Sequence, residues 1–132
     1  MSNNKFLFVL KNEDSKQMFK IIVFIPISHT EKVRNALFKS GAGKLGNYDC
    51  CSFETTGTGQ FRPLAGSNPY LGTENLVEKV IEIKLEIVCS KKNIKDAIKA
   101  MKQAHPYEEV AFDVIKLETS FDEGPIERIE DS

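Results

Sequence analysis

Four side chains able to bind cations or exchange protons lie within five residues in the C-terminal third of the chain. His105, Tyr107, Glu108 and Glu109 surround Pro106 and offer an imidazole, a phenol and two carboxylates. Such a set can coordinate a divalent metal or take part in proton transfer. A helix that ends at a histidine and is broken by proline explains the same residues structurally. This turn is therefore the first candidate site, and a purely structural role at the end of a helix is the alternative.

The metal-binding hypothesis takes His105, Glu108 and Glu109 as candidate ligands, with Cys51 completing the site from a neighbouring element. One histidine and two glutamates from a single turn do not make a complete site. No Ser-His-Asp or Cys-His set can be assembled, so no catalytic residue is predicted. An enzyme that uses Glu108 or Glu109 as a general base, with His105 as its partner, is the least favoured hypothesis.

A second candidate lies in the glycine-rich segment 57–63, where Gly57, Thr58, Gly59 and Arg62 could contact a small anion or a nucleotide. The segment lacks the Lys-Ser/Thr ending of a P-loop. A loop that packs against a neighbouring subunit would use the same residues, and packing is the preferred interpretation. The G-x-G-x-x-G spacing at 41–46 follows a helix rather than a strand, which argues against a dinucleotide site.

The elements that must position these residues are visible in the hydrophobic pattern. Residues 18–27 form a β-branched and aromatic run that predicts a central strand. Residues 76–88 alternate between apolar and charged side chains, which is typical of a strand with one buried face. Weaker patterns predict strands at 48–56 and 110–117, with a long loop from Gly57 to Gly72.

Two helices are predicted between these strands. The sequence Ser28-His29-Thr30-Glu31 indicates a capping box, and the helix that follows should run to about Ser40. Ser90 is the expected cap of a second helix that Pro106 stops. The order strand, helix, strand, strand, helix, strand predicts an α+β ferredoxin-like βαββαβ sandwich, an antiparallel sheet with two helices on one face.

Composition indicates one soluble domain. The chain has 132 residues, 28% of them charged, and a formal charge of −1, so bulk charge gives no support for nucleic-acid binding. No apolar run approaches the length of a membrane span. We expect a loose arm over 1–16, the domain over 17–118, an acidic and disordered tail over 119–132, and a cytoplasmic location. The three cysteines, an odd number, are expected to be reduced thiols.

Several short motifs together resemble a known family. They include Gly46-Asn47-Tyr48, Cys51-Ser52-Phe53, the run from Gly57 to Pro63, and the His105 to Glu109 turn. In combination they resemble the inserted middle domain of YqfO-type proteins in the NGG-interacting-factor-three-like family, over about residues 18–117. That domain is similar in fold to CutA and PII proteins, and CutA proteins carry a related His-Pro-Tyr-Glu turn.

The resemblance implies a ferredoxin-like subunit that associates into homotrimers. The flanking domains that supply the family's two-metal centre have no counterpart here, so no metal ligand is carried over, and the chain looks like a stand-alone form of the insert. We therefore expect a non-catalytic binding or regulatory module, with a divalent-metal-binding CutA-like protein as the alternative. The expected ligand-binding or interface residues are Asn47, Tyr48, Cys51, Gly57, Gly59, Arg62, His105, Tyr107, Glu108 and Glu109.

Overall fold

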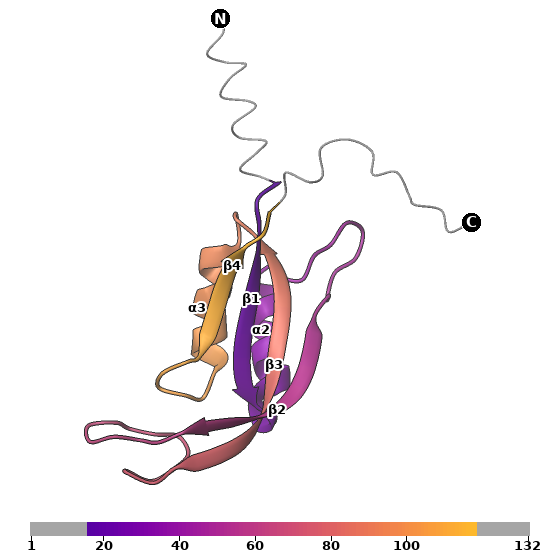
Figure 1. The fold of residues 1–132 in the computed structure, drawn as a ribbon. Coiled ribbons are helices and arrows are strands. Elements are labelled where there is room, and N and C mark those ends of the chain that lie inside the picture. The colour runs from indigo at the N-terminus through magenta and orange to yellow at the C-terminus, as the bar shows by residue number, and fades with distance from the viewer. Residues whose placement is uncertain (1–15, 119–132) are drawn as a thin grey trace, which may run out of the picture.

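The computed structural model describes residues 16–118, which form four strands, two α-helices and one short 3-10 helix (Figure 1). Their bounds are β1 Met18–Pro26, η1 Ile27–His29, α2 Thr30–Lys39, β2 Phe53–Phe61, β3 Glu78–Ser90, α3 Ile94–Ala104 and β4 Phe112–Lys116. Residues 1–15 of the predicted arm and the whole predicted tail lie outside the described residues. Among the described helices, none has the length and apolar character needed to cross a membrane.

The strands form one sheet in the order β2-β3-β1-β4, and every neighbouring pair is antiparallel. The two crossovers, through α2 and α3, place both helices on the same face of the sheet (Figure 1). This is the predicted βαββαβ arrangement, and the prediction is confirmed. The long strand β3 pairs with β2 over residues 78–86 and with β1 over residues 82–90. The Phe61 end of β2 and the Glu78 end of β3 therefore extend beyond β1 and the helical layer (Figure 1).

The core lies between the sheet and the two helices. Alternate residues of β1 and β3 point toward the helices, as the period of two in a strand requires. The fully buried side chains are Ile21, Val23, Ile25, Val33, Leu37, Leu85, Ile87, Cys89, Ala97 and Met101. Burial raises the pKa of the Cys89 thiol, which makes this cysteine an inert core residue.

The opposite face of the sheet, here called the open face, is not covered by any element among residues 16–118. Ile22 and Phe24 of β1 lie on it beside Val88 of β3, because they alternate with the core residues. Phe53 of β2 and Ile115 of β4 add exposed apolar surface at 67% and 47% exposure. This surface is interrupted by charged side chains.

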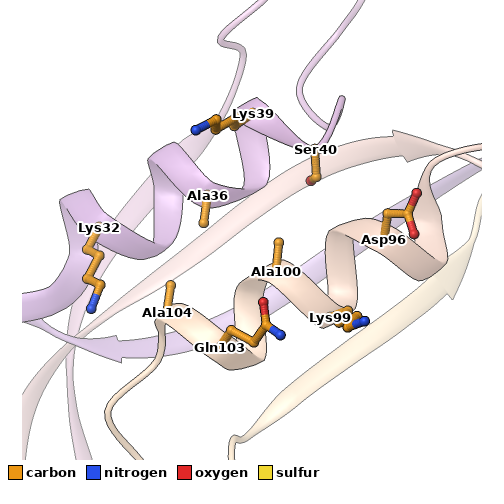
Figure 2. A pocket seen from close by; sticks show the side chains of 9 residues that line it. All are labelled: Lys32, Ala36, Lys39, Ser40, Asp96, Lys99, Ala100, Gln103 and Ala104. Atoms are coloured by element: carbon orange, nitrogen blue, oxygen red, sulfur yellow. The ribbon is translucent and has the colours of Figure 1, made fainter.

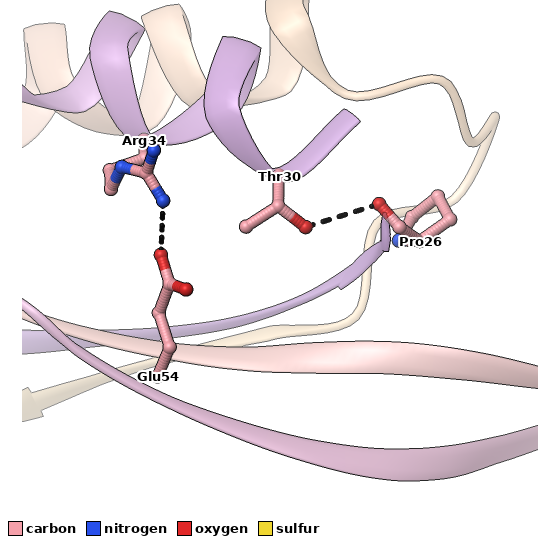
Figure 3. Close-up of polar contacts among 4 residues, drawn as sticks. All are labelled: Pro26, Thr30, Arg34 and Glu54. Carbon is pink, nitrogen blue, oxygen red and sulfur yellow. Dashed lines mark hydrogen bonds and ion pairs between the residues drawn. The ribbon is translucent and has the colours of Figure 1, made fainter. Parts of the chain in front are cut away.

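The start of α2 corrects the predicted capping box. The helix begins at Thr30 after η1, its N-cap is His29, and no side chain caps its first turn. The Ser28 hydroxyl instead pairs with Nδ1 of His29, and the Thr30 hydroxyl donates to the Pro26 carbonyl oxygen at 3.3 Å (Figure 3). The capping box fails because the 3-10 turn occupies the residues that should have capped the helix. The second helix likewise begins at Ile94, after Asn93 rather than Ser90.

An ion pair attaches α2 to the edge of the sheet. Arg34 donates to the carboxylate of Glu54 on β2, 20 residues away (Figure 3). The helix ends as predicted: Gly41 has φ +101, and the Ala42 amide donates back to the Leu37 carbonyl oxygen at 3.1 Å, which are features of a Schellman motif.

The strand predicted at 48–56 is wrong at both ends. Cys50 has φ 52, a left-handed conformation that no strand continues through, and β2 begins only at Phe53. It then runs through Gly57 and Gly59 to Phe61, a segment predicted as loop. Backbone pairing with β3 over nine residue pairs overrides the low strand propensity of glycine.

Candidate ligand-binding cleft

His105 is a buried structural residue at the end of α3, with 6% of its surface exposed. Its Nε2 donates to the Phe24 carbonyl oxygen at 2.7 Å, and its Nδ1 accepts the Tyr107 amide at 3.1 Å. Because the amide can only donate, Nδ1 must be unprotonated and Nε2 must carry the proton. Both ring nitrogens are therefore engaged, and a metal at either one would have to break a backbone hydrogen bond.

The surroundings of His105 favour its neutral form. Burial is the main cause that lowers its pKa, the hydrogen bond to the Phe24 carbonyl opposes this, and the electrostatic interaction with His29 adds a smaller lowering. Within residues 16–118, no group of three or more His, Cys, Asp or Glu side chains is arranged to hold a metal ion. The geometry thus gives His105 the task of fixing the turn that follows it.

That turn is joined to the β2–β3 connection, 40 residues away in sequence. The backbone amide of Asn68 donates to Oε2 of the Glu108 side chain at 2.8 Å. Between them lies a cavity of about 410 Å³, here called the cleft, lined by residues from 60–71, by residues from 107–111 and by Glu82 of β3. The structure therefore brings the two sequence-predicted candidates, the glycine-rich segment and the turn, into one site.

One wall of the cleft is aromatic. The ring of Tyr107 lies 6.0 Å from that of Phe61 and 6.3 Å from that of Tyr70, with interplanar angles of 56° and 47°. His29 meets Tyr70 edge-on at 5.6 Å, which supports the outer side of this wall. Tilted rings at such separations attract one another, which holds this wall together.

The Glu82 carboxyl and the Tyr107 hydroxyl form the most perturbed part of the cleft. Burial raises the pKa of Glu82, an effect that its proximity to Tyr107 partly offsets. The pKa of Tyr107 rises to about 12, first through burial and then through the charge of Glu82. The two groups are close enough to shift each other, yet no hydrogen bond of standard geometry satisfies the buried Tyr107 hydroxyl.

Gly59 makes room for the Glu82 carboxyl. A Cβ at this position would lie 1.6 Å from Oε1 of Glu82, whereas a Cβ at Gly57, two residues earlier on the same face of β2, would meet nothing within 4 Å. The absence of a side chain at Gly59 is therefore what allows Glu82 to lie across the strand toward Tyr107.

We expect Gly59→Ala to push the Glu82 carboxyl away and to lower the pKa of Tyr107 from about 12. Ultraviolet titration of tyrosinate formation, compared between the wild type and Tyr107→Phe to isolate this group, measures the shift. The matched control is Gly57→Ala, which should leave the titration unchanged. Equal titration curves for Gly59→Ala and the wild type would show that Glu82 does not depend on this glycine.

The structure divides the ten sequence-predicted site residues into separate groups. Arg62, Tyr107, Glu108 and Glu109 line the cleft, while His105 and Gly59 support it. The remaining four residues do not line the cleft: Asn47, Tyr48, Cys51 and Gly57, of which Gly57 pairs with Glu82 across the strands. Cys51 lines a separate hollow beside Lys20 and Glu86. Its backbone amide donates to the Gly43 carbonyl oxygen, and the Gly43 amide in turn donates to the Val88 carbonyl oxygen of β3. Val88 is six residues along β3 from Glu82, roughly 20 Å at the rise of a strand.

The cleft residues that were missed from sequence include the two aromatic residues Phe61 and Tyr70 and the charged residue Glu82. Glu82 belongs to the regular apolar and charged alternation of β3, which predicts a solvated side chain.

A hollow between the two helices is also present, lined by Lys32, Ala36, Lys39, Ser40, Asp96, Lys99, Ala100, Gln103 and Ala104 (Figure 2). Its floor consists of alanines and its rim of long polar side chains, so it offers few convergent groups.

No family model matches the chain. The chain is 40% identical over 109 residues to the GTP cyclohydrolase 1 type 2 homolog of Halalkalibacterium halodurans, covering 83% of this chain and 29% of that protein. The corresponding Bacillus subtilis homolog is 41% identical over 110 residues, again 83% of this chain and 30% of the relative. The chain thus spans less than a third of the length of these curated relatives.

A solved structure of a longer protein also matches the chain. A Bacillus cereus protein related to NIF3 superposes with a TM-score of 0.68 at 43% identity, covering 78% of this chain and 26% of that one. The chain is homologous to the insert region of NIF3-like proteins. The resemblance to that region is confirmed.

The CutA/PII-like fold is confirmed by two further structures, which share little sequence with the chain. CutA from Xylella fastidiosa has a TM-score of 0.57 at 17% identity, over 80% of this chain and 88% of its own. GlnK from Bacillus subtilis has a TM-score of 0.52 at 20% identity, over 77% and 86%.

Proposed function

We propose that this NIF3-insert-like domain is a non-catalytic binding module that associates into a homotrimer and binds a small ligand in the cleft. The observation that carries the binding function is the meeting of two segments 40 residues apart in sequence: joined by the Asn68–Glu108 hydrogen bond, they line one half-open cavity with an aromatic wall. Cavities of this size with a few convergent polar groups are typical of small-molecule sites.

Association through the open face rests on a second observation. Ile22, Phe24 and Val88 form apolar surface on a sheet face with no covering layer among the described residues. Glu82 and Phe61 lie on the same face of the sheet as these residues. A trimer with its open faces turned inward therefore places the cleft beside the boundary between subunits, where a bound ligand can report on or alter assembly.

The cleft assignment is tested by mapping where small molecules bind. We expect a diverse fragment library, screened by ¹H–¹⁵N NMR on the full chain, to shift amides of residues 60–71 and 107–111. The hollow between α2 and α3 serves as the internal comparison. Fragments that cluster between the helices, or that shift no cleft amide, would contradict the assignment.

Metal binding and hydrolysis gain no specific support from the site. The imidazole is occupied by backbone groups on both nitrogens, and Glu108 already accepts the Asn68 amide. The cyclohydrolase name belongs to the longer relatives. We therefore retain binding as the proposed function.

A further inference from the structure

The charges that line the cleft are mostly negative. Glu82, Glu108 and Glu109 contribute carboxyl groups, and Arg62 contributes the only lining guanidinium among the described residues. Within residues 16–118, the ion pairs Lys20–Glu86 and Arg34–Glu54 lie outside the cleft, and none of the four cleft charges belongs to an ion pair there. An anion entering this cavity would face three carboxyl groups for one guanidinium, which argues against the anionic ligand predicted from sequence.

The aromatic wall supplies the second half of the recognition surface. Phe61, Tyr70 and Tyr107 present tilted rings to the same cavity as the carboxyl groups. The electron-rich face of an aromatic ring attracts a cation, and substituted ammonium groups are held well by such rings because they are weakly hydrated. The cavity, at about 410 Å³, is far larger than a metal ion and suits a small organic molecule.

The Glu82 carboxyl lies in the cleft at a position where a bound cation could contact it. It lies across Gly59, toward the buried Tyr107 hydroxyl that has no hydrogen-bond partner of standard geometry. Burial raises the pKa of Glu82, an effect that Tyr107 partly offsets, and within residues 16–118 the Glu82 carboxyl belongs to no ion pair. An incoming positive group would compensate for the solvation lost on burial.

We infer that the cleft binds a small organic cation, whose substituted ammonium group is held by the carboxylates and whose alkyl groups contact the aromatic rings. This inference rests on the proposed binding function and adds the chemical class of the ligand. In this inference Glu82 contacts the ammonium charge and the ring of Tyr107 contacts the alkyl groups. Arg62 makes no favourable contact with the ligand.

The test uses choline as the cationic probe and 3,3-dimethyl-1-butanol as its neutral isostere, with adenosine monophosphate as an anionic probe. Titrations of the full chain are followed by NMR at the cleft amides. We expect choline to bind and the neutral isostere to bind at least about tenfold more weakly, because only choline carries the charge that the carboxylates recognise.

Two substitutions separate a cation site from an anion site. Glu82→Gln removes the charge at nearly constant shape and is expected to weaken choline binding at least about tenfold. Arg62→Ala should leave choline binding unchanged or tighten it, whereas it would weaken an anion. Asp96→Asn, on α3 and outside both the cleft and the open face, is the control for loss of one carboxylate and should bind choline as the wild type does.

The outcomes distinguish this inference from the function on which it rests. Binding of adenosine monophosphate at the cleft in preference to choline, with loss in Arg62→Ala, would overturn the cation class and leave the cleft as a binding site. Equal affinity for choline and its neutral isostere would likewise overturn charge recognition. Choline shifts confined to residues outside the cleft, together with fragments that bind elsewhere, would overturn both.

Discussion

Replacing His105 with alanine is expected to lower the free energy of unfolding by about 2–4 kcal/mol. The substitution removes a buried ring and leaves the Phe24 carbonyl oxygen and the Tyr107 amide without their partners. Buried polar groups that lose their hydrogen bonds carry the full cost of desolvation. Urea denaturation followed by circular dichroism measures the loss.

Two variants make this result specific. His105→Gln can place an amide donor near the Phe24 carbonyl oxygen and should recover part of the stability. Glu109→Ala changes an exposed residue of the same turn and should stay within about 0.5 kcal/mol of the wild type. If His105→Ala were as stable as Glu109→Ala, the structural role assigned to the imidazole would be wrong.

The same histidine gives stability a defined pH dependence. Its folded-state pKa lies below the ordinary 6.5, so the unfolded chain binds more protons than the folded chain as pH falls below that value. The contribution of His105 is therefore complete above about pH 6.5 and is lost as pH falls from there toward the lower folded-state pKa. His105→Gln should flatten this part of the stability profile; an unchanged profile would contradict the neutral imidazole.

The second large effect is expected on the open face, where Ile22→Lys should convert the proposed trimer into monomers. Ile22 pairs across the sheet with Glu86 and Asp113, so a lysine here finds carboxylates within its own subunit and the fold is retained. In a trimer the same ammonium would have to be desolvated between subunits, and desolvation costs several kcal/mol per ion even where a partner is near. Sedimentation velocity and circular dichroism measure mass and fold separately.

The control for this substitution is Val114→Lys. Val114 pairs with Ile21 and therefore lies on the helix side of the edge strand β4, where it is 38% exposed. This variant should sediment like the wild type. Dissociation by both variants would locate the interface elsewhere, and a folded Ile22→Lys that keeps the wild-type mass would exclude the open face.

The sequence predicted the central strands because their patterns are long and unambiguous. The apolar run that became β1 and the alternation that became β3 each extend over nine residues or more. The continuation of β2 through Gly57 and Gly59 could not be predicted, since glycine gives no strand signal and only pairing with β3 holds it extended.

The candidate site was predicted in its parts and missed in its assembly. The turn was recognised from its side chains, but the role of His105 depends on a carbonyl 81 residues away in sequence. Glu82 lies in an ordinary alternating strand, and its direction across Gly59 follows from a neighbour on another strand. Long-range geometry of this kind leaves no local signature in the pattern.

The most direct test of the assembled binding module is the mass of the wild-type chain in solution. Sedimentation equilibrium at micromolar concentration and physiological salt should give a single species with three times the chain mass of 14.9 kDa. A single species at 14.9 kDa under the same conditions would contradict the proposed trimer.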